Sequence, residues 1–224
     1  AEITRSYQIE KLSTVFDFTT INAEAKLNRL AIKENLLVVS DKESNSVYKY
    51  NLESKEGSKI DGSFSQPENI TAYQSGFYLQ TKDNVQKLNS SGEKPTTAAN
   101  NSGWGKIVGA SAYQSNLYLL DKDKAEVWRY FGTSSGLSSA RAYLVGEKPN
   151  LADASAIGID ELVWVATRKG NIYKFAQGKK QEFSLTNLSD SLGDVVDFYT
   201  SLETKNHYIL DQGKGRVVIV SKDG

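Results

Sequence analysis

The chain contains 224 residues, and its 27 basic and 27 acidic side chains give a formal net charge of zero at pH 7. A balanced charge creates no field that would attract nucleic acid or an anionic membrane, so we expect neither as a partner. The longest apolar runs, such as residues 36–39 and 162–166, are far shorter than the roughly 18 residues of a membrane-spanning helix. We therefore expect no direct insertion into a membrane.

The residue types that are rare or missing exclude several kinds of catalytic and metal-binding site. The sequence has no cysteine, which excludes disulfides, thiolate metal sites and cysteine nucleophiles. Its single histidine, His207, leaves a zinc site short of imidazole ligands, and we expect it to be a half-buried side chain at the start of a strand. We expect no metal and no cofactor. Because position 1 is not Met, we expect the chain to begin at a processing point and to be one module of an extracellular or membrane-tethered protein.

In chain order, three kinds of β-rich segment repeat. The first is a short run of small and apolar residues, at 29–32, 69–73, 110–113, 156–159 and 196–199. The second is an apolar run that closes on Asp or Thr, at 36–41, 77–81, 117–121, 162–167 and 207–211. The third starts with an apolar residue and is mostly aromatic and basic, at 47–50, 85–88, 127–130, 172–175 and 217–220. Short linkers rich in Asp, Lys, Asn and Gly join the second run to the third, which predicts a β-hairpin.

A weaker fourth run follows some hairpins, for example at 140–144 and 181–185. Four antiparallel strands in roughly 40 to 45 residues are typical of a propeller blade. The sequence therefore predicts one all-β domain, a five-bladed β-propeller of four-stranded antiparallel blades, with blades at about 13–62, 63–102, 103–150, 151–192 and 193–224 plus 1–12. The last repeat lacks a fourth run, and residues 2–9 alternate as a strand does, so we expect the N-terminal strand to complete the last blade and close the ring.

Two hairpins carry a resemblance to a known family. Residues Leu117–Asp121 followed by Val127–Tyr130, and Tyr208–Asp211 followed by Arg216–Val220, resemble NHL-type β-propeller repeats. The chain is also similar to the propeller domains attached to bacterial phosphatase-like proteins, although it contains no phosphatase motif. The resemblance implies a fold and leaves the function open, because propellers support binding, scaffolding and several kinds of catalysis.

The closing residues of the second runs invite two interpretations. Asp stands there in three repeats, at 41, 121 and 211, and Thr in the other two, at 81 and 167. Three carboxylates around a ring suggest a metal or catalytic site. Asp and Thr, however, both cap turns through their side-chain oxygens, so the recurring position favours a structural role.

We expect one face of the disc to bind a protein or carbohydrate ligand. In a propeller blade, the turns between the second and third strands lie on the same face as the connections between blades. Trp104 lies in such a connection, between glycines and outside the repeat, where it either anchors a partner or folds back over a blade edge. The candidate binding residues are Trp104, Phe64, Asp121, Arg168 and Asp197.

These features predict a monomeric, non-enzymatic scaffold or binding module, and two alternatives stay open. A lectin needs similar sugar pockets between blades, and the interblade loops match poorly. A glycoside hydrolase needs two carboxylates about 5 to 9.5 Å apart at the mouth of the channel. Asp197 is the strongest candidate because it sits on an innermost strand, among six acidic residues near such strands: Asp17, Asp153, Asp160, Glu161, Asp194 and Asp197.

Overall fold

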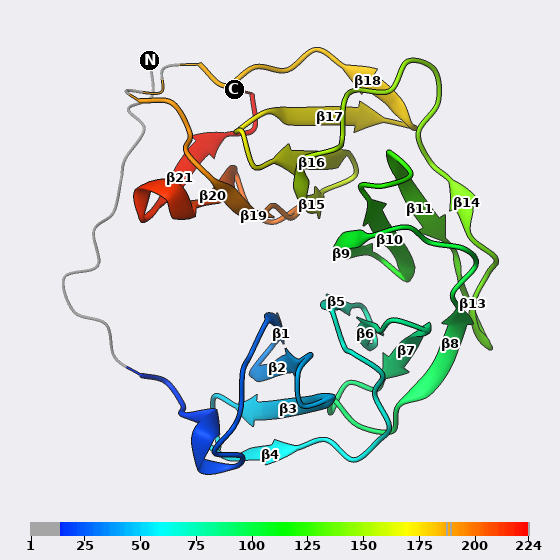
Figure 1. Cartoon of the computed structure of the whole chain (residues 1–224), viewed down its shortest axis with the longest axis vertical. Coiled ribbons are helices and arrows are strands. Elements are labelled where there is room, and N and C mark those ends of the chain that lie inside the picture. Colours follow the sequence, from blue (N-terminus) through cyan, green and yellow to red (C-terminus); the bar gives the residue numbers. More distant parts are fainter. Residues whose placement is uncertain (1–13, 187, 189, 224) are drawn as a thin grey trace.

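A computed structural model describes residues 14–186, 188 and 190–223. This part of the chain contains no α-helix, only two short 3-10 turns, η1 (Phe18–Thr20) and η2 (Gln212–Lys214). Five antiparallel sheets stand around a common centre (Figure 1). The predicted all-β, five-bladed β-propeller is therefore confirmed.

Each sheet is one blade, and its strands run outward in chain order from the centre. Blade 1 consists of β1 (Arg29–Lys33), β2 (Leu36–Asp41), β3 (Ser46–Asn51) and β4 (Gly57–Lys59). Blade 2 consists of β5 (Asn69–Tyr73), β6 (Gly76–Gln80), β7 (Asn84–Leu88) and β8 (Thr96–Asn100). Blade 4 consists of β15 (Ala154–Ile159), β16 (Val163–Thr167), β17 (Ile172–Ala176) and β18 (Lys179–Gln181).

Blade 3 carries an insertion that the sequence reading missed. Its sheet is β9 (Ile107–Tyr113), β10 (Asn116–Asp121), β11 (Glu126–Tyr130) and β14 (Arg141–Ala142). Between β11 and β14 a separate hairpin forms from β12 (Gly132–Thr133) and β13 (Gly136–Leu137). Strand β13 packs on β8 of blade 2. A Cβ at Gly136 would lie 2.9 Å from the carbonyl oxygen of Ala98, so this contact requires glycine.

Blade 5 consists of three strands within the described residues: β19 (Val195–Tyr199), β20 (Asn206–Asp211) and β21 (Arg216–Ser221). The predicted fourth strand, at residues 2–9, lies outside the described residues. Innermost strands pack on their neighbours from β1 through β5, β9 and β15 to β19. The described parts of β19 and β1 have no comparable packing, and Figure 1 shows blades 5 and 1 standing apart.

Apolar side chains fill the spaces between neighbouring blades. Strand β2 illustrates the pattern, because it is covered on both faces. Val38 packs toward blade 2 with Phe77 and Leu79, whereas Val39 packs on the opposite face with Tyr48 and Phe18. A strand covered on both sides needs a continuous apolar run, which explains why the second runs do not alternate.

In three blades, an aspartate ties the incoming linker to the hairpin turn. The Asp at the end of the second strand is completely buried in blades 1, 3 and 5. Its carboxylate accepts a hydrogen bond from a linker amide, at 2.8 Å from Lys26 to Asp41, 2.8 Å from Gly105 to Asp121 and 3.0 Å from Gly193 to Asp211. The structural interpretation of the repeated Asp is thus confirmed.

Thr81 and Thr167 take the turn role in blades 2 and 4. Their hydroxyl groups accept hydrogen bonds from the turn amides of Asn84 and Asn171, each at 3.1 Å. In these two blades, the backbone of the turn bonds the linker directly, as from Arg168 N to the carbonyl oxygen of Asp153 at 2.9 Å. Hairpin turns and interblade connections therefore share one face of the disc, as predicted.

Candidate binding sites

The turn-bearing face holds most of the predicted binding residues, but two of them are buried. Phe64 is 6% exposed and packs in the core between blades 1 and 2. The carboxylate of Asp121, besides Gly105, accepts hydrogen bonds from Lys124 N at 3.1 Å and Trp128 Nε1 at 2.9 Å. Both side chains therefore stabilise the fold and are not available to a ligand on this face.

Hydrogen bonds from backbone amides also determine the charge state of Asp41 on this face. Burial alone would raise the pKa of Asp41, but the backbone amides of Ser44, Lys26 and Glu43 donate to its carboxylate and hold the pKa below its usual value. The carboxylate is therefore ionised and saturated with donors at neutral pH, which is the state of a turn cap.

Trp104 folds back onto blade 3. Asn101 Oδ1 accepts hydrogen bonds from the amides of Gly103 at 2.8 Å and Trp104 at 2.9 Å, which shapes the loop. The indole Nε1 donates to the hydroxyl of Tyr130 at 2.7 Å, and the ring packs against the core between blades 2 and 3. Of the two interpretations of Trp104, these contacts favour cover of a blade edge.

Substitution of Trp104 with phenylalanine should lower the free energy of unfolding by about 1 kcal/mol. The change removes the hydrogen bond to the buried Tyr130 hydroxyl and keeps an aromatic ring. Urea unfolding of this variant measures the loss, and Lys106→Ala in the same loop provides an exposed comparison. A Trp104→Phe protein as stable as the original would show that the indole hydrogen bond contributes nothing.

Arg168 is exposed and engaged in an ion pair. Its Nη1 atom lies 2.9 Å from both carboxylate oxygens of Asp194. This pair joins the turn of blade 4 to the linker that enters blade 5. The predicted binding role of Arg168 stays a prediction.

The central channel is a cavity of about 770 Å³ lined by all five innermost strands. Small neutral side chains dominate its wall, among them Ala72, Ala110 and Ser111. Asp197 is exposed and lines this channel, and Glu203 is the only other carboxylate among the described lining residues.

The other acidic residues considered for a hydrolase lie outside the channel or are engaged in hydrogen bonds and ion pairs. Asp17 caps η1, and Asp194 pairs with Arg168. Asp160 is buried and bonds Trp164 Nε1 at 2.7 Å, Thr200 Oγ1 at 2.9 Å and Lys222 Nζ at 2.8 Å. Asp153 and Glu161 do not line the channel. Of the six predicted acidic residues, only Asp197 therefore lines the channel.

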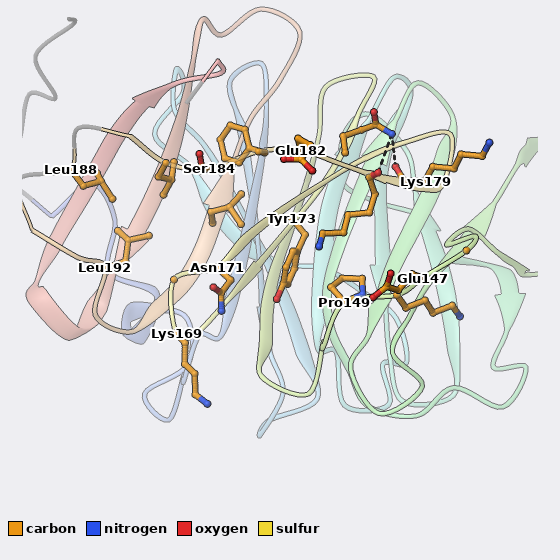
Figure 2. A pocket seen from close by; sticks show the side chains of 18 of the residues that line it. Glu147, Pro149, Lys169, Asn171, Tyr173, Lys179, Glu182, Ser184, Leu188 and Leu192 are labelled. Carbon is orange, nitrogen blue, oxygen red and sulfur yellow. Dashed lines mark hydrogen bonds between the residues drawn. The ribbon is translucent and has the colours of Figure 1, made fainter.

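A second cavity, of about 920 Å³, lies along the outer rim of blade 4 (Figure 2). We call it the rim groove. Its walls come from the linker at 145–149, the turn at 169–171, strands β17 and β18, and the segment that follows β18. Figure 2 shows Leu188 and Leu192 at one end and Glu147 and Lys179 toward the other.

The rim groove combines cationic and apolar surface. Four lysines line it, and Lys148 is paired with the buried Glu126 at 2.5 Å. The other three, Lys169, Lys179 and Lys180, form no ion pair within the described residues, and they outnumber the two glutamates of the lining, Glu147 and Glu182. Strand β18 is the outermost strand of its sheet, and its three residues are exposed.

Sequence reasoning came close to this groove without finding it. Arg168, one of the predicted binding residues, directly precedes Lys169 of the lining. The pair Lys179–Lys180 was a usable signal, but only the fold shows that it lines the same cavity as Lys169 and the apolar segment after β18.

Neither a metal site nor a membrane span was found in the residues that the structure describes. No group of three or more His, Cys, Asp or Glu side chains is arranged to hold a metal ion there. No helix in this part has the length and apolar character needed to cross a bilayer.

Comparisons with known proteins identify the fold of the chain but assign it to no family. No protein-family model matches the sequence, and no curated protein matches it. Among solved structures, a gluconolactonase from Xanthomonas campestris is similar at a TM-score of 0.67 and 12% identity, over 90% of this chain and 74% of that one. A chain of a nidogen–laminin complex is similar at a TM-score of 0.64 and 15% identity, over 87% and 75%.

A designed protein is similar too. The computationally designed Ika8 matches at a TM-score of 0.57 and 10% identity, over 87% of this chain and 70% of that one. At such identities the likenesses show the fold alone. With the observed topology, they support a β-propeller whose blades resemble NHL-type repeats.

Proposed function

We propose that this propeller is a non-catalytic binding module, and that it holds an extended segment of a partner protein in the rim groove. The observation that carries the proposal is the composition of the groove, whose lining contains both leucines and lysines without an ion pair in the described residues. A segment that alternates apolar and acidic residues complements both.

The outer edge of β18 adds a reason for an extended ligand. A peptide strand that docks on an outermost strand gains main-chain hydrogen bonds. At β18 it would displace the Gln181 side chain, whose Nε2 donates to the carbonyl oxygens of Lys179 at 3.0 Å and Lys180 at 3.2 Å. Side chains on one face of such a strand then lie against the groove. Tyr173, with Lys180 Nζ 5.6 Å from its ring centre, offers an aromatic surface at this place.

Fluorescence anisotropy with a labelled peptide of alternating leucine and glutamate tests this proposal. We expect binding to the original protein, and roughly tenfold weaker binding to the double variant Lys169→Glu/Lys180→Glu, because two attractive charges become repulsive. The matched control is Lys82→Glu/Lys59→Glu, which makes the same charge change at the corresponding turn of blade 2 and outer strand of blade 1.

The control variant distinguishes binding in the rim groove from a general effect of the protein's charge on peptide binding. Equal weakening in both double variants would contradict the rim groove as the site. Equal binding of a leucine–lysine peptide would contradict recognition of acidic residues. Binding of a neutral oligosaccharide in place of either peptide would favour the lectin alternative.

A hydrolase is the second candidate, and two observations favour it. Asp197 is exposed to the channel, and the gluconolactonase shares the fold. Incubation with glucono-δ-lactone and with nitrophenyl glycosides tests this alternative. Turnover that disappears in Asp197→Asn, at unchanged stability, would replace the non-catalytic proposal.

A further inference from the structure

Two arginines lie next to each other on the outer part of blade 3. Arg129 of β11 and Arg141 of β14 stand directly opposite each other in the register of the two strands, so their side chains leave the sheet on the same face. Like charges that face each other on neighbouring strands repel and destabilise the pair. This position therefore favours the binding of a negatively charged group.

The described residues supply no negative charge to this pair. Neither Arg129 nor its neighbour takes part in a hydrogen bond or an ion pair there, whereas Arg29, Arg168 and Arg216 each have a partner. The Nε atom of Arg129 is buried and has no hydrogen-bond partner in this part of the chain. A buried donor without an acceptor is unfavourable, and an acceptor from outside the chain would relieve it.

The arginine pair is a departure from the repeat. In blades 1, 2 and 4, the fourth-strand residue opposite the basic residue of the third strand is uncharged: Ser58 opposite Lys49, Thr96 opposite Lys87 and Gln181 opposite Lys174. Blade 3 has a second cation at this place. Because the other blades form the same sheet without it, Arg141 is not required by the propeller fold.

Aromatic rings restrain both guanidinium groups. The Cζ atom of Arg129 lies 4.5 Å from the ring centre of Phe131 and 5.4 Å from that of Tyr143. The Cζ atom of Arg141 lies 5.5 Å from the centre of the same Phe131 ring. A guanidinium group that stacks on a ring keeps the N–H groups at its edge free to donate. Less freedom is then lost when a ligand binds.

The inserted hairpin fixes Phe131 and leaves the pair accessible. Phe131 N donates to Ser138 Oγ at 2.9 Å, and Ser138 N donates to the carbonyl oxygen of Phe131 at 2.8 Å. These two bonds close the base of the hairpin that separates β11 from β14. Arg141 is exposed, and Arg129 and Phe131 are half-buried, so a small anion can reach both guanidinium groups from solvent.

The chemistry of the pair favours a tetrahedral oxyanion. Each guanidinium group presents its N–H groups in a planar fork that can bond two oxygen atoms. Two forks match an anion with three or four oxygens better than a carboxylate, which has two. A phosphomonoester also carries a charge of about −1.5 to −2 at pH 7, which balances two arginines.

We propose that Arg129 and Arg141 bind a dianionic phosphoryl group, either that of free phosphate or that of a phosphate ester on a partner. Neither arginine lines the rim groove, and Phe131 and Tyr143 do not line it either. This site is therefore independent of the peptide proposed for the groove, and either proposal can fail without the other.

Isothermal titration calorimetry with inorganic phosphate, at pH 7.5 and an ionic strength held constant with chloride, tests the site. We expect a dissociation constant of about 1 mM for the original protein, and at least tenfold weaker binding to Arg141→Gln, because one fork is lost. The matched control is Lys124→Gln, which removes one exposed positive charge from the same blade and should change the affinity less than twofold. Equal weakening in the two variants would overturn the proposal.

A second variant separates recognition by the fork from attraction by charge. Arg129→Lys keeps the charge and much of the apolar stem, so we expect an unchanged urea midpoint and at least fivefold weaker phosphate binding. Full affinity in this variant would overturn the two-arginine site. Acetate should bind the original protein at least tenfold more weakly than phosphate, and equal binding of acetate would overturn the assignment to a phosphoryl group.

A phosphoserine peptide flanked by glycines distinguishes the two sources of the phosphoryl group. Binding at least tenfold tighter than that of inorganic phosphate, together with no binding of the unphosphorylated peptide, would support a phosphate ester on a partner. Binding no tighter than that of inorganic phosphate would support free phosphate. If neither inorganic phosphate nor the phosphopeptide binds the original protein, the proposal is wrong.

Discussion

Replacement of Asp121 with alanine should lower the free energy of unfolding by roughly 3 kcal/mol or more. The carboxylate is completely buried and accepts hydrogen bonds from Gly105 N, Lys124 N and Trp128 Nε1. Alanine would leave three donors without this acceptor, on the half-buried Gly105 and Trp128 and on the exposed Lys124. Each unsatisfied donor costs about 1 to 3 kcal/mol, and water entering the space would recover part of the loss.

Urea unfolding followed by fluorescence measures this effect, and the neighbouring turn supplies the control. Asp123 is exposed in the same hairpin, so Asp123→Ala should change the stability by less than about 0.5 kcal/mol. Asp121→Asn, which keeps one oxygen, should lie between the two. An Asp121→Ala protein of undiminished stability would show that the repeated aspartate does not hold the turn.

The second large effect is a dependence of stability on pH that comes from His207. The side chain is completely buried, and its ring centre lies 4.3 Å from that of Trp164 and 5.0 Å from that of Phe198. Neither ring nitrogen has a hydrogen-bond partner within the described residues. Burial lowers the pKa of His207 to about 4; Asp160 opposes this shift, and the charges of Lys222 and Lys174 add to it.

The sign of the effect follows from the two pKa values. The unfolded chain takes up a proton below its ordinary pKa of about 6.5, whereas the folded chain resists until about pH 4. The stabilisation is therefore present above pH 6.5 and is lost as the pH falls toward 4. Its size is about 1.4 kcal/mol per pH unit, or roughly 3 kcal/mol over the window.

Substitution of His207 with phenylalanine should remove this pH dependence. Phenylalanine fits an aromatic cage and carries no group that protonates, so the variant should be at least as stable as the original at pH 7. The measurement is the free energy of unfolding of both proteins from pH 7.5 to 4. All other titratable groups are the same in both proteins, so the difference between the curves isolates His207. Parallel curves would show that His207 is not the source.

The repeat made most of the fold predictable from sequence. Each blade must bury small residues next to the channel and apolar runs on both faces of its second strand, so residues such as 36–41 and 117–121 recur with the same composition. The repeated Asp was predictable as a turn cap for the same reason. The burial of His207 was underestimated, because its cage is assembled from Trp164, Phe183 and Phe198 of two blades.

The candidate sites were less predictable, for a physical reason. A binding site on a propeller is formed by segments that follow no common pattern. Phe64 lies in the loop between β4 and β5, but its side chain is buried and fills the space between blades 1 and 2. The rim groove depends on the place where the segment after β18 lies, and its leucines contact the core between blades 4 and 5.

The extra hairpin of blade 3 has a consequence for the order in which the molecule comes apart. Blades 1 and 5 each have one described neighbour, whereas blades 2 and 3 are joined both by their core and by the contact of β13 with β8. This contact lies on the far side of the disc from the place where blades 5 and 1 stand apart (Figure 1). Local unfolding should therefore begin at blades 1 and 5 and reach blades 2 and 3 last. The inserted hairpin thus determines the order in which the blades unfold.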